Sequence, residues 1–117
     1  MAAVTQIAFQ LAETRTKEGS SFSLPVYLRD RATASAVTPT TIHWRLDCLT
    51  TGRELEGATI VTPASSFTIA LTGSHNAIRN DSNEQETKQV TVTTDEGLAT
   101  QYREIVRWTV ENIYGSF

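Results

Sequence analysis

The chain has 117 residues with 39% hydrophobic content, which is a usual length for one domain and enough apolar material for a core without a metal or a disulfide. Its formal net charge is -3 and its basic residues are scattered along the chain. That balance argues against a nucleic-acid partner and against a membrane surface, because both need concentrated Lys and Arg.

The first segment, Met1–Ser21, contains a short apolar cluster followed by a polar stretch. It lacks the basic and apolar regions of a secretory signal, and we expect synthesis in the cytoplasm. Two interpretations stay open: an arm that packs on a partner, or the first strand of the domain. In the arm interpretation, the predicted partner contacts are Val4, Ile7, Phe9 and Leu11.

Alternation of apolar and polar residues dominates the rest of the chain and predicts strands. The segment Phe22–Leu28 alternates around Pro25, which indicates an edge strand or a bulge. In the last strand Glu104 interrupts the alternation, so we expect a bulge there or a second buried face at Ile105. Further strands are predicted at Ile42–Cys48, Glu54–Val61, Phe67–Leu71, Val90–Val92 and Tyr102–Val110.

Turn residues separate these runs, and Asn76–Thr87 is the longest polar stretch, which we interpret as a crossover between two sheets. The predicted core consists of the residues in the apolar phase of each strand. They are Phe22, Leu24, Val26, Leu28, Ile42, Trp44, Leu46, Phe67, Ile69, Leu71, Val90, Val92, Val106, Trp108 and Val110.

About seven strands with no helical period predict an all-β fold, a single Greek-key β-sandwich of the immunoglobulin-like class. The sandwich domain would span residues 22–117, with residues 1–21 as the arm or first strand. Cys48 is the chain's only cysteine, and its apolar phase predicts a buried structural thiol rather than a nucleophile.

No catalytic motif accompanies these strands, so the sequence predicts that the protein is not an enzyme and needs no cofactor or metal. His43 alternates outward between apolar neighbours, which is typical of a surface or cross-strand histidine. The acidic segment Asp81–Glu86 has oxygen ligands at alternate positions, but it lacks the glycine of a calcium loop.

Two long stretches carry a resemblance: TTIHWRLDCLTTGRELEGATIVTPASSFTIALTG and KQVTVTTDEGLATQYREIVRWTVENIYG. Across Val37–Gly115 the chain resembles small uncharacterised proteins encoded among the structural genes of tailed bacteriophages. The resemblance implies an immunoglobulin-like or fibronectin-like virion component assembled in the host cytoplasm. Its implied partners are other virion proteins, namely capsid, neck or tail subunits, with the chain homo-oligomeric or present in many copies in the particle.

Two functions follow as expectations. The first is a structural virion module, such as a capsid decoration protein or a head-to-tail or tail component, that acts through protein contacts. The second is a receptor- or carbohydrate-binding sandwich, for which the available aromatic side chains are Tyr27, Tyr114 and Phe117. At the C-terminus, Ile113, Tyr114 and Phe117 are further predicted partner contacts.

Overall fold

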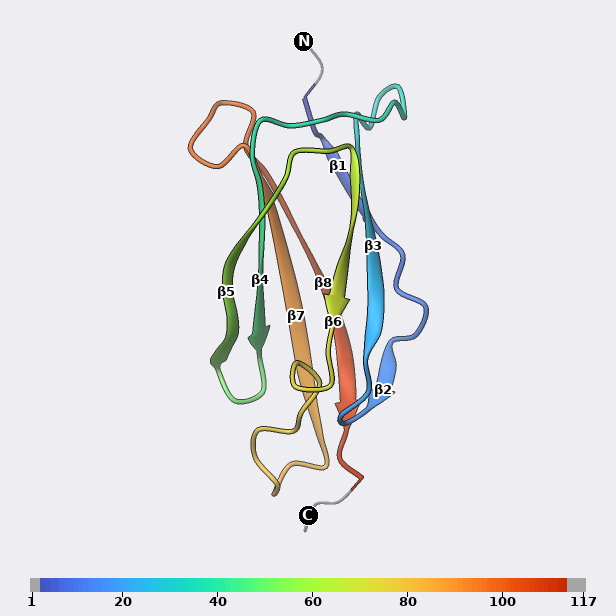
Figure 1. The fold of residues 1–117 in the computed structure, drawn as a ribbon, viewed down its shortest axis with the longest axis vertical. Coiled ribbons are helices and arrows are strands. Elements are labelled where there is room, and N and C mark those ends of the chain that lie inside the picture. The colour runs from blue at the N-terminus through green and yellow to red at the C-terminus, as the bar shows by residue number, and fades with distance from the viewer. Residues whose placement is uncertain (1–2, 114–117) are drawn as a thin grey trace.

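Eight β-strands and no helix form within residues 3–113, the part of the chain that the computed structural model describes (Figure 1). None of these residues therefore belongs to a helix long and apolar enough to cross a membrane. The strands are β1 (Gln6–Phe9), β2 (Arg15–Lys17), β3 (Phe22–Arg29), β4 (Ile42–Cys48), β5 (Arg53–Val61), β6 (Ser66–Leu71), β7 (Gln85–Thr94) and β8 (Tyr102–Glu111).

The strands form two sheets that face each other. The smaller sheet has the order β1-β3-β6, and the larger has the order β2-β8-β7-β4-β5. Every pairing is antiparallel except that of β2 with β8. Connections cross between the sheets after β1, β2, β3, β5 and β6, while β4-β5 and β7-β8 are hairpins (Figure 1). This is the strand order of an immunoglobulin-like sandwich, so the predicted fold class is confirmed.

The N-terminal segment contributes a strand to each sheet, because β1 pairs with β3 and β2 pairs with β8. The side chains of Val4 and Ile7 are buried in the core of their own chain. The eighth strand, β2, was not expected, because Arg15–Lys17 is short, polar and half-exposed and so has no apolar phase to detect.

The core confirms most of the predicted set. Of that set, Phe22, Phe67 and Val106 are only half-buried, and the others are buried. Three buried hydrophobic core residues were missing from the prediction: Val4, Ile7 and Val37. Cys48 is fully buried, as its apolar phase predicted; it forms no disulfide, and its thiol donates to Glu86 Oε1 at 3.6 Å.

Two local predictions need correction. Pro25 lies on the central strand of the smaller sheet, in regular register with β6. The proline is tolerated there because its backbone faces the end of β1, where Gln10 N–H donates to the Pro25 carbonyl and no further strand follows.

The expected bulge at Glu104 is absent, since β8 pairs with β7 in unbroken register along its whole length. Glu104 instead sits half-buried on the inner face near the rim, 3.4 Å from the Tyr102 hydroxyl that donates to it. Ile105 faces outward with 39% of its surface exposed, so it does not form a second buried face.

Candidate interaction surfaces

The outer face of the larger sheet carries a hollow of about 450 Å³. Successive outward side chains of β4, β7 and β8 form its floor, because residues two apart on a strand share a face. The loop of the β7-β8 hairpin closes one end with Glu96. We call this site the outer-face hollow; its lining is His43, Arg45, Asp47, Ala58, Gln89, Thr91, Thr93, Glu96, Arg103 and Ile105.

The charged side chains that line the hollow are paired within the chain. Arg45 forms a two-pronged contact with Asp47, with Nε to Oδ2 at 3.0 Å and a second nitrogen to Oδ1 at 2.8 Å. The hydrogen bond from Arg45 to Asp47 raises the pKa of Arg45. Glu96 lies 3.6 Å from His43 Nε2 and 4.0 Å from Arg103. The face therefore presents both signs of charge in fixed positions.

The free edge of β6 is a second candidate surface. Leu28 N–H on β3 donates to the Ser65 carbonyl, and the register continues through Val26 with Phe67 and Leu24 with Ile69. Because antiparallel strands alternate the direction of their backbone groups, Phe67 and Ile69 bond to β3. The backbone groups of Ser66, Thr68 and Ala70 therefore point away from the sheet.

Nothing in the described part of the chain pairs with those outward groups, and all three residues are exposed. Their side chains are small and uncharged, and β6 contains neither a proline nor a bulge. Charged side chains, prolines and bulges are the features that usually prevent strand addition at the edges of protein sheets. We call the outward backbone of Ser66, Thr68 and Ala70 the β6 edge.

The other edges differ from β6. On β5 the pairing with β4 slips twice, between Trp44 and Leu46 and between Leu46 and Asp47, and the strand carries Arg53, Glu54 and Glu56. Bulges and charges of this kind discourage strand addition. β1 and β2 have only four and three residues. The β6 edge is thus the longest regular, uncharged edge among the described strands.

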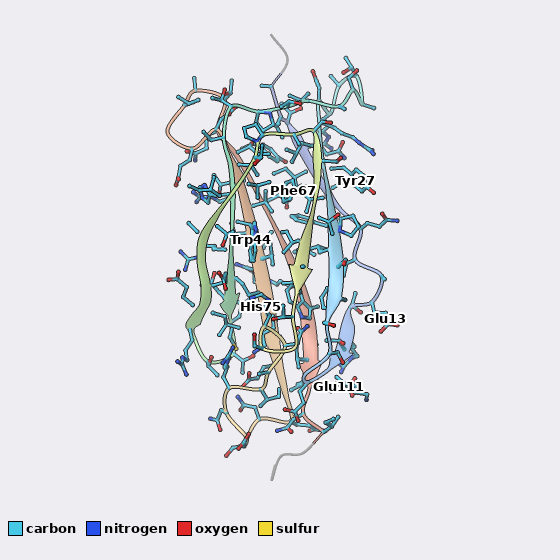
Figure 2. The ribbon with its side chains drawn as sticks, viewed as in Figure 1. Glu13, Tyr27, Trp44, Phe67, His75 and Glu111 are labelled. Carbon is cyan, nitrogen blue, oxygen red and sulfur yellow. The ribbon has the colours of Figure 1, made fainter. Side chains whose placement is uncertain are left out.

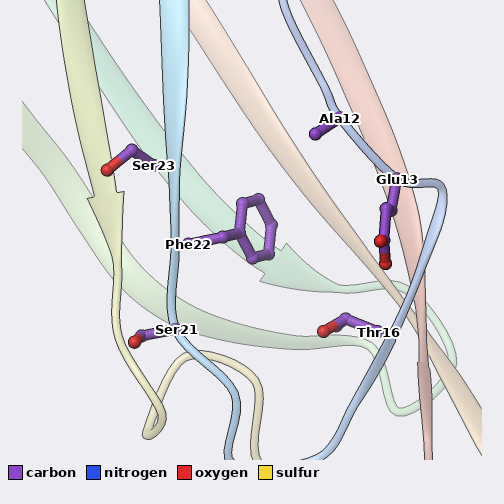
Figure 3. Close-up of a pocket in the computed structure, with 6 residues that line it drawn as sticks. All are labelled: Ala12, Glu13, Thr16, Ser21, Phe22 and Ser23. Atoms are coloured by element: carbon purple, nitrogen blue, oxygen red, sulfur yellow. The ribbon is translucent and has the colours of Figure 1, made fainter.

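A smaller hollow of about 280 Å³ lies between β3 and the segment that crosses from β1 to β2 (Figure 3). The Phe22 ring points into it, and Ala12, Glu13 and Thr16 line the opposite side. The same ring packs edge-on against Trp108 with centroids 5.3 Å apart. This hollow is a gap at the rim of the core, and Glu13 is its one titratable lining group.

A buried ion pair lies at the end of the sandwich where β7 begins. Glu86 and Lys88 point inward from β7, both fully buried, with Lys88 Nζ 3.1 Å from the Glu86 carboxylate. Lys88 also donates to the Ala77 carbonyl at 2.8 Å. Glu86 accepts from the backbone N–H groups of Arg79 and Asn80 at 2.8 and 2.9 Å.

These contacts fix the ionisation of Glu86. Burial alone would raise its pKa, but the hydrogen bonds from the Arg79 N–H, from Asn83, from Lys88 and from the Asn80 N–H outweigh burial and lower the pKa to about 2. The carboxylate binds the β6-β7 loop to the sheet and has no exposed surface for a substrate. Its arrangement is that of a structural anchor.

Another buried polar contact fixes the same loop. Trp108 Nε1 donates to Asn76 at 2.7 Å, and Asn76 donates to the Ser20 carbonyl at 2.8 Å. Nearby, the His75 ring packs edge-on against Trp44, with 6.4 Å between centroids (Figure 2). The crossover predicted at Asn76–Thr87 therefore does join the two sheets, although β7 starts earlier than expected, at Gln85.

The predicted partner contacts fall in different places. Val4 and Ile7 are buried, and Phe9 and Leu11 are half-buried against the core, so this apolar cluster is covered largely by its own chain. Ile113 is 49% exposed at the end of β8. Tyr114 and Phe117 lie outside the described residues.

The remaining candidates are also located. His43 faces outward, as its phase predicted, with 18% of its side chain exposed. Tyr27 lies on the smaller sheet, where Arg29 stacks over its ring at 5.5 Å and its hydroxyl donates to Gln10. Within residues 3–113, His, Cys, Asp and Glu side chains form no group that could hold a metal ion.

Sequence reasoning missed both candidate surfaces. Most residues of the outer-face hollow lie in the outward phase of the predicted strands, so the sequence could place them on a surface. It could not show which of them are neighbours, because that depends on the order of the strands. The β6 edge left no signal of its own, since edge position is a property of the whole sheet.

No protein-family model matches this chain, and no curated protein matches it. Among solved structures, it is similar to a conjugative transposon lipoprotein from Bacteroides eggerthii, with a TM-score of 0.52 and 11% identity. The match covers 87% of this chain and 93% of that chain. At this identity the likeness supports the β-sandwich fold and no shared activity.

Proposed function

We propose that this chain is a non-enzymatic module that binds a partner protein by accepting an extended strand at the β6 edge. The observation that carries the proposal is the set of outward N–H and C=O groups at Ser66, Thr68 and Ala70, which lie in regular strand geometry without partners in the described chain. Strand addition is a common mode of peptide recognition, in which the backbone supplies the hydrogen bonds.

The side chains favour a particular kind of strand. Beside the β6 edge, Phe67 is only half-buried, and Leu55 and Val61 of β5 are half-buried as well. No residue of β5 is fully buried, so the smaller sheet leaves the inner side of that strand incompletely covered. An added strand with apolar residues at alternate positions would extend the apolar layer that Phe67 and Ile69 form on β6.

The setting of this contact is a virion. The resemblance of Val37–Gly115 to tailed-phage proteins supports that part of the proposal, and the partner is then a capsid, neck or tail subunit. Many identical copies of a small sandwich suit a symmetric particle. In that setting the chain co-purifies with particles at a fixed copy number, and its absence from purified particles would contradict the virion role.

Thr68→Pro tests the strand addition. Proline removes one outward N–H and leaves the bonds from Phe67 and Ile69 to β3 in place, so the fold should survive, as edge strands tolerate proline in this orientation. Thr68→Val is the matched control, because it changes the side chain and keeps the N–H.

The probe is a displayed library of short random peptides. We expect the selected peptides to have apolar residues at alternate positions and to bind wild type and Thr68→Val with similar affinity. Their affinity for Thr68→Pro should be at least about tenfold lower, and a tenfold loss corresponds to about 1.4 kcal/mol of binding free energy. Peptides that bind all three proteins equally would overturn the proposal. Binding of glycans in place of peptides would favour the receptor-binding alternative.

A further inference from the structure

We propose that the outer face of the larger sheet is a self-association surface, on which a second copy of this chain packs face to face about a two-fold axis parallel to β7. This surface is separate from the β6 edge, which belongs to the other sheet. Self-association at this face and strand addition at the β6 edge are therefore independent of each other.

The charges on this face are of both signs, which selects among classes of partner. Arg45, Arg103, Arg107, Asp47, Glu54 and Glu96 lie on it or at its rim, and Arg15, Lys17 and Glu111 lie on its β2 side. A ligand of a single sign, such as nucleic acid or a polyacidic peptide, would meet repulsion as well as attraction there. A partner must present both signs in matching positions.

Along one row of the sheet the two signs lie at opposite ends, and Asp47 also contacts Arg45 of its own strand. The pairing register places Asp47 of β4, Gln89 of β7 and Arg107 of β8 side by side in one row. Arg107 donates to Gln89 at 2.8 Å, and no carboxylate among the described residues pairs with it. The β4 end of this row is acidic and the β8 end is basic.

A two-fold axis along β7 reverses each row onto itself. Arg107 then faces Asp47 of the partner subunit, and Asp47 faces Arg107 of the partner subunit, so one row gives two equivalent ion pairs. An axis across the strands at the level of Ile105 would instead bring Arg107 towards Arg103 of the partner subunit, which is repulsive. The charge pattern thus selects the first arrangement, an isologous interface.

The shape and the apolar content of the face suit this packing. The outer-face hollow has a volume of about 450 Å³, room for long side chains from the second copy. Ile60 pairs with His43 on the outward side and is 86% exposed, and Ile105 is 39% exposed. Both would lose contact with water in the dimer, which supplies an apolar contribution beside the charge pairs.

The area of the face indicates how tightly two copies should associate. Four strands at a spacing of about 4.8 Å and about 30 Å in length give about 600 Å². A standard specific interface covers about 800 Å² on each partner. We therefore expect reversible association in the micromolar range, weakened in about 1 M salt, where the Debye length falls to about 3 Å.

Charge reversal provides the test, by sedimentation equilibrium of the full chain over a range of concentrations. Arg107→Asp makes each ion pair acid against acid, and Asp47→Arg makes each pair base against base. Each variant alone should remain a monomer. An equimolar mixture of the two should form a heterodimer, because both pairs again join opposite charges.

Two controls separate this interface from other effects. Arg29→Asp makes the same charge change on the outer face of the smaller sheet and should dimerise like wild type. The charge-swapped variant carrying both Arg107→Asp and Asp47→Arg should also dimerise, which shows that the single variants were folded but mismatched.

Monomeric wild type at every concentration would overturn the proposal, and so would dimers of both single variants or a mixture that stays monomeric. Thr68→Pro should leave dimerisation unchanged, so a failure of strand addition and a failure of this interface can be told apart.

Discussion

Glu86→Gln should damage the fold severely, although it changes a single atom. The wild-type carboxylate accepts hydrogen bonds from two backbone N–H groups, from Asn83 at 3.0 Å and from Lys88 at 3.1 Å. Glutamine places an NH₂ donor against these donors and leaves the buried ammonium of Lys88 without a counter-charge. Removal of one partner from a buried ion pair costs about 3–5 kcal/mol, and we expect a loss in that range at neutral pH.

The same carboxylate predicts a pH dependence. Its pKa is about 2 in the folded chain against 4.5 for the free group. Because folding lowers this pKa, the associated stability is fully present above pH 4.5 and is lost as the pH falls towards 2; the difference corresponds to about 3 kcal/mol. The Glu86→Gln variant lacks this contribution, so the difference in unfolding free energy between wild type and the variant should become smaller as the pH falls below 4.5.

Urea unfolding followed by the fluorescence of Trp44 and Trp108 measures these differences at neutral pH and at about pH 3. The double variant with Glu86→Gln and Lys88→Met should be more stable than Glu86→Gln alone, since it buries no unpaired charge. A loss below about 1 kcal/mol at neutral pH, or a deficit that does not change with pH, would refute this account of Glu86.

Three further predictions follow from other contacts. Gly73→Ala should cost about 1–3 kcal/mol in urea unfolding, because its Cβ would lie 2.6 Å from the Gly19 carbonyl oxygen; a smaller loss would mean that the two backbones separate easily. Asp95→Ala should lower the free energy of unfolding by about 2 kcal/mol. The Asp95 carboxylate accepts hydrogen bonds from the N–H groups of Thr40 and Thr41 and from the Thr100 hydroxyl, and the φ of 52° at this position disfavours alanine. A change within about 0.5 kcal/mol would contradict the role of Asp95 in holding the β7-β8 hairpin to β4. Cys48 should react with a thiol reagent in urea and stay unreacted in the native chain, since it is fully buried; rapid native labelling would show that the strand end opens.

The sandwich was predictable because its strands obey a simple rule. In Ile42–Cys48 every second residue is apolar, and each of those side chains is buried. Such alternation reports one buried face directly. By contrast, β2 escaped detection because it is short and half-exposed, and its place beside β8 depends on parallel pairing with a strand far away in the sequence.

The buried ion pair shows a different limit. Glu86 and Lys88 continue the inward phase of Val90 and Val92, so spacing alone would have placed them in the core. Their charges argued for solvent, because such residues are almost never fully buried unless paired. The pair could be recognised only once the loop through Arg79 and Asn80 was in place to satisfy it.

The candidate surfaces depend on topology in the same way. Asp47 and Arg107 are sixty residues apart in the printed sequence, and only the pairings of β4 and β8 with β7 put them in one row. Likewise, the composition of Ser66–Leu71 fits a central strand as well as an edge strand. Its place at the end of the strand order β1-β3-β6 identifies it as an edge.

Amide hydrogen exchange along β6, resolved residue by residue by NMR, tests the proposed strand addition most directly. In the free chain, Phe67 and Ile69 should be protected by β3, and Ser66, Thr68 and Ala70 should exchange at rates close to those of an unstructured chain. A peptide selected from the displayed library should then protect those outward amides. Protection of all five amides in the free chain, or exchange at Thr68 that stays fast with the peptide bound, would contradict the assignment of β6 as the binding edge.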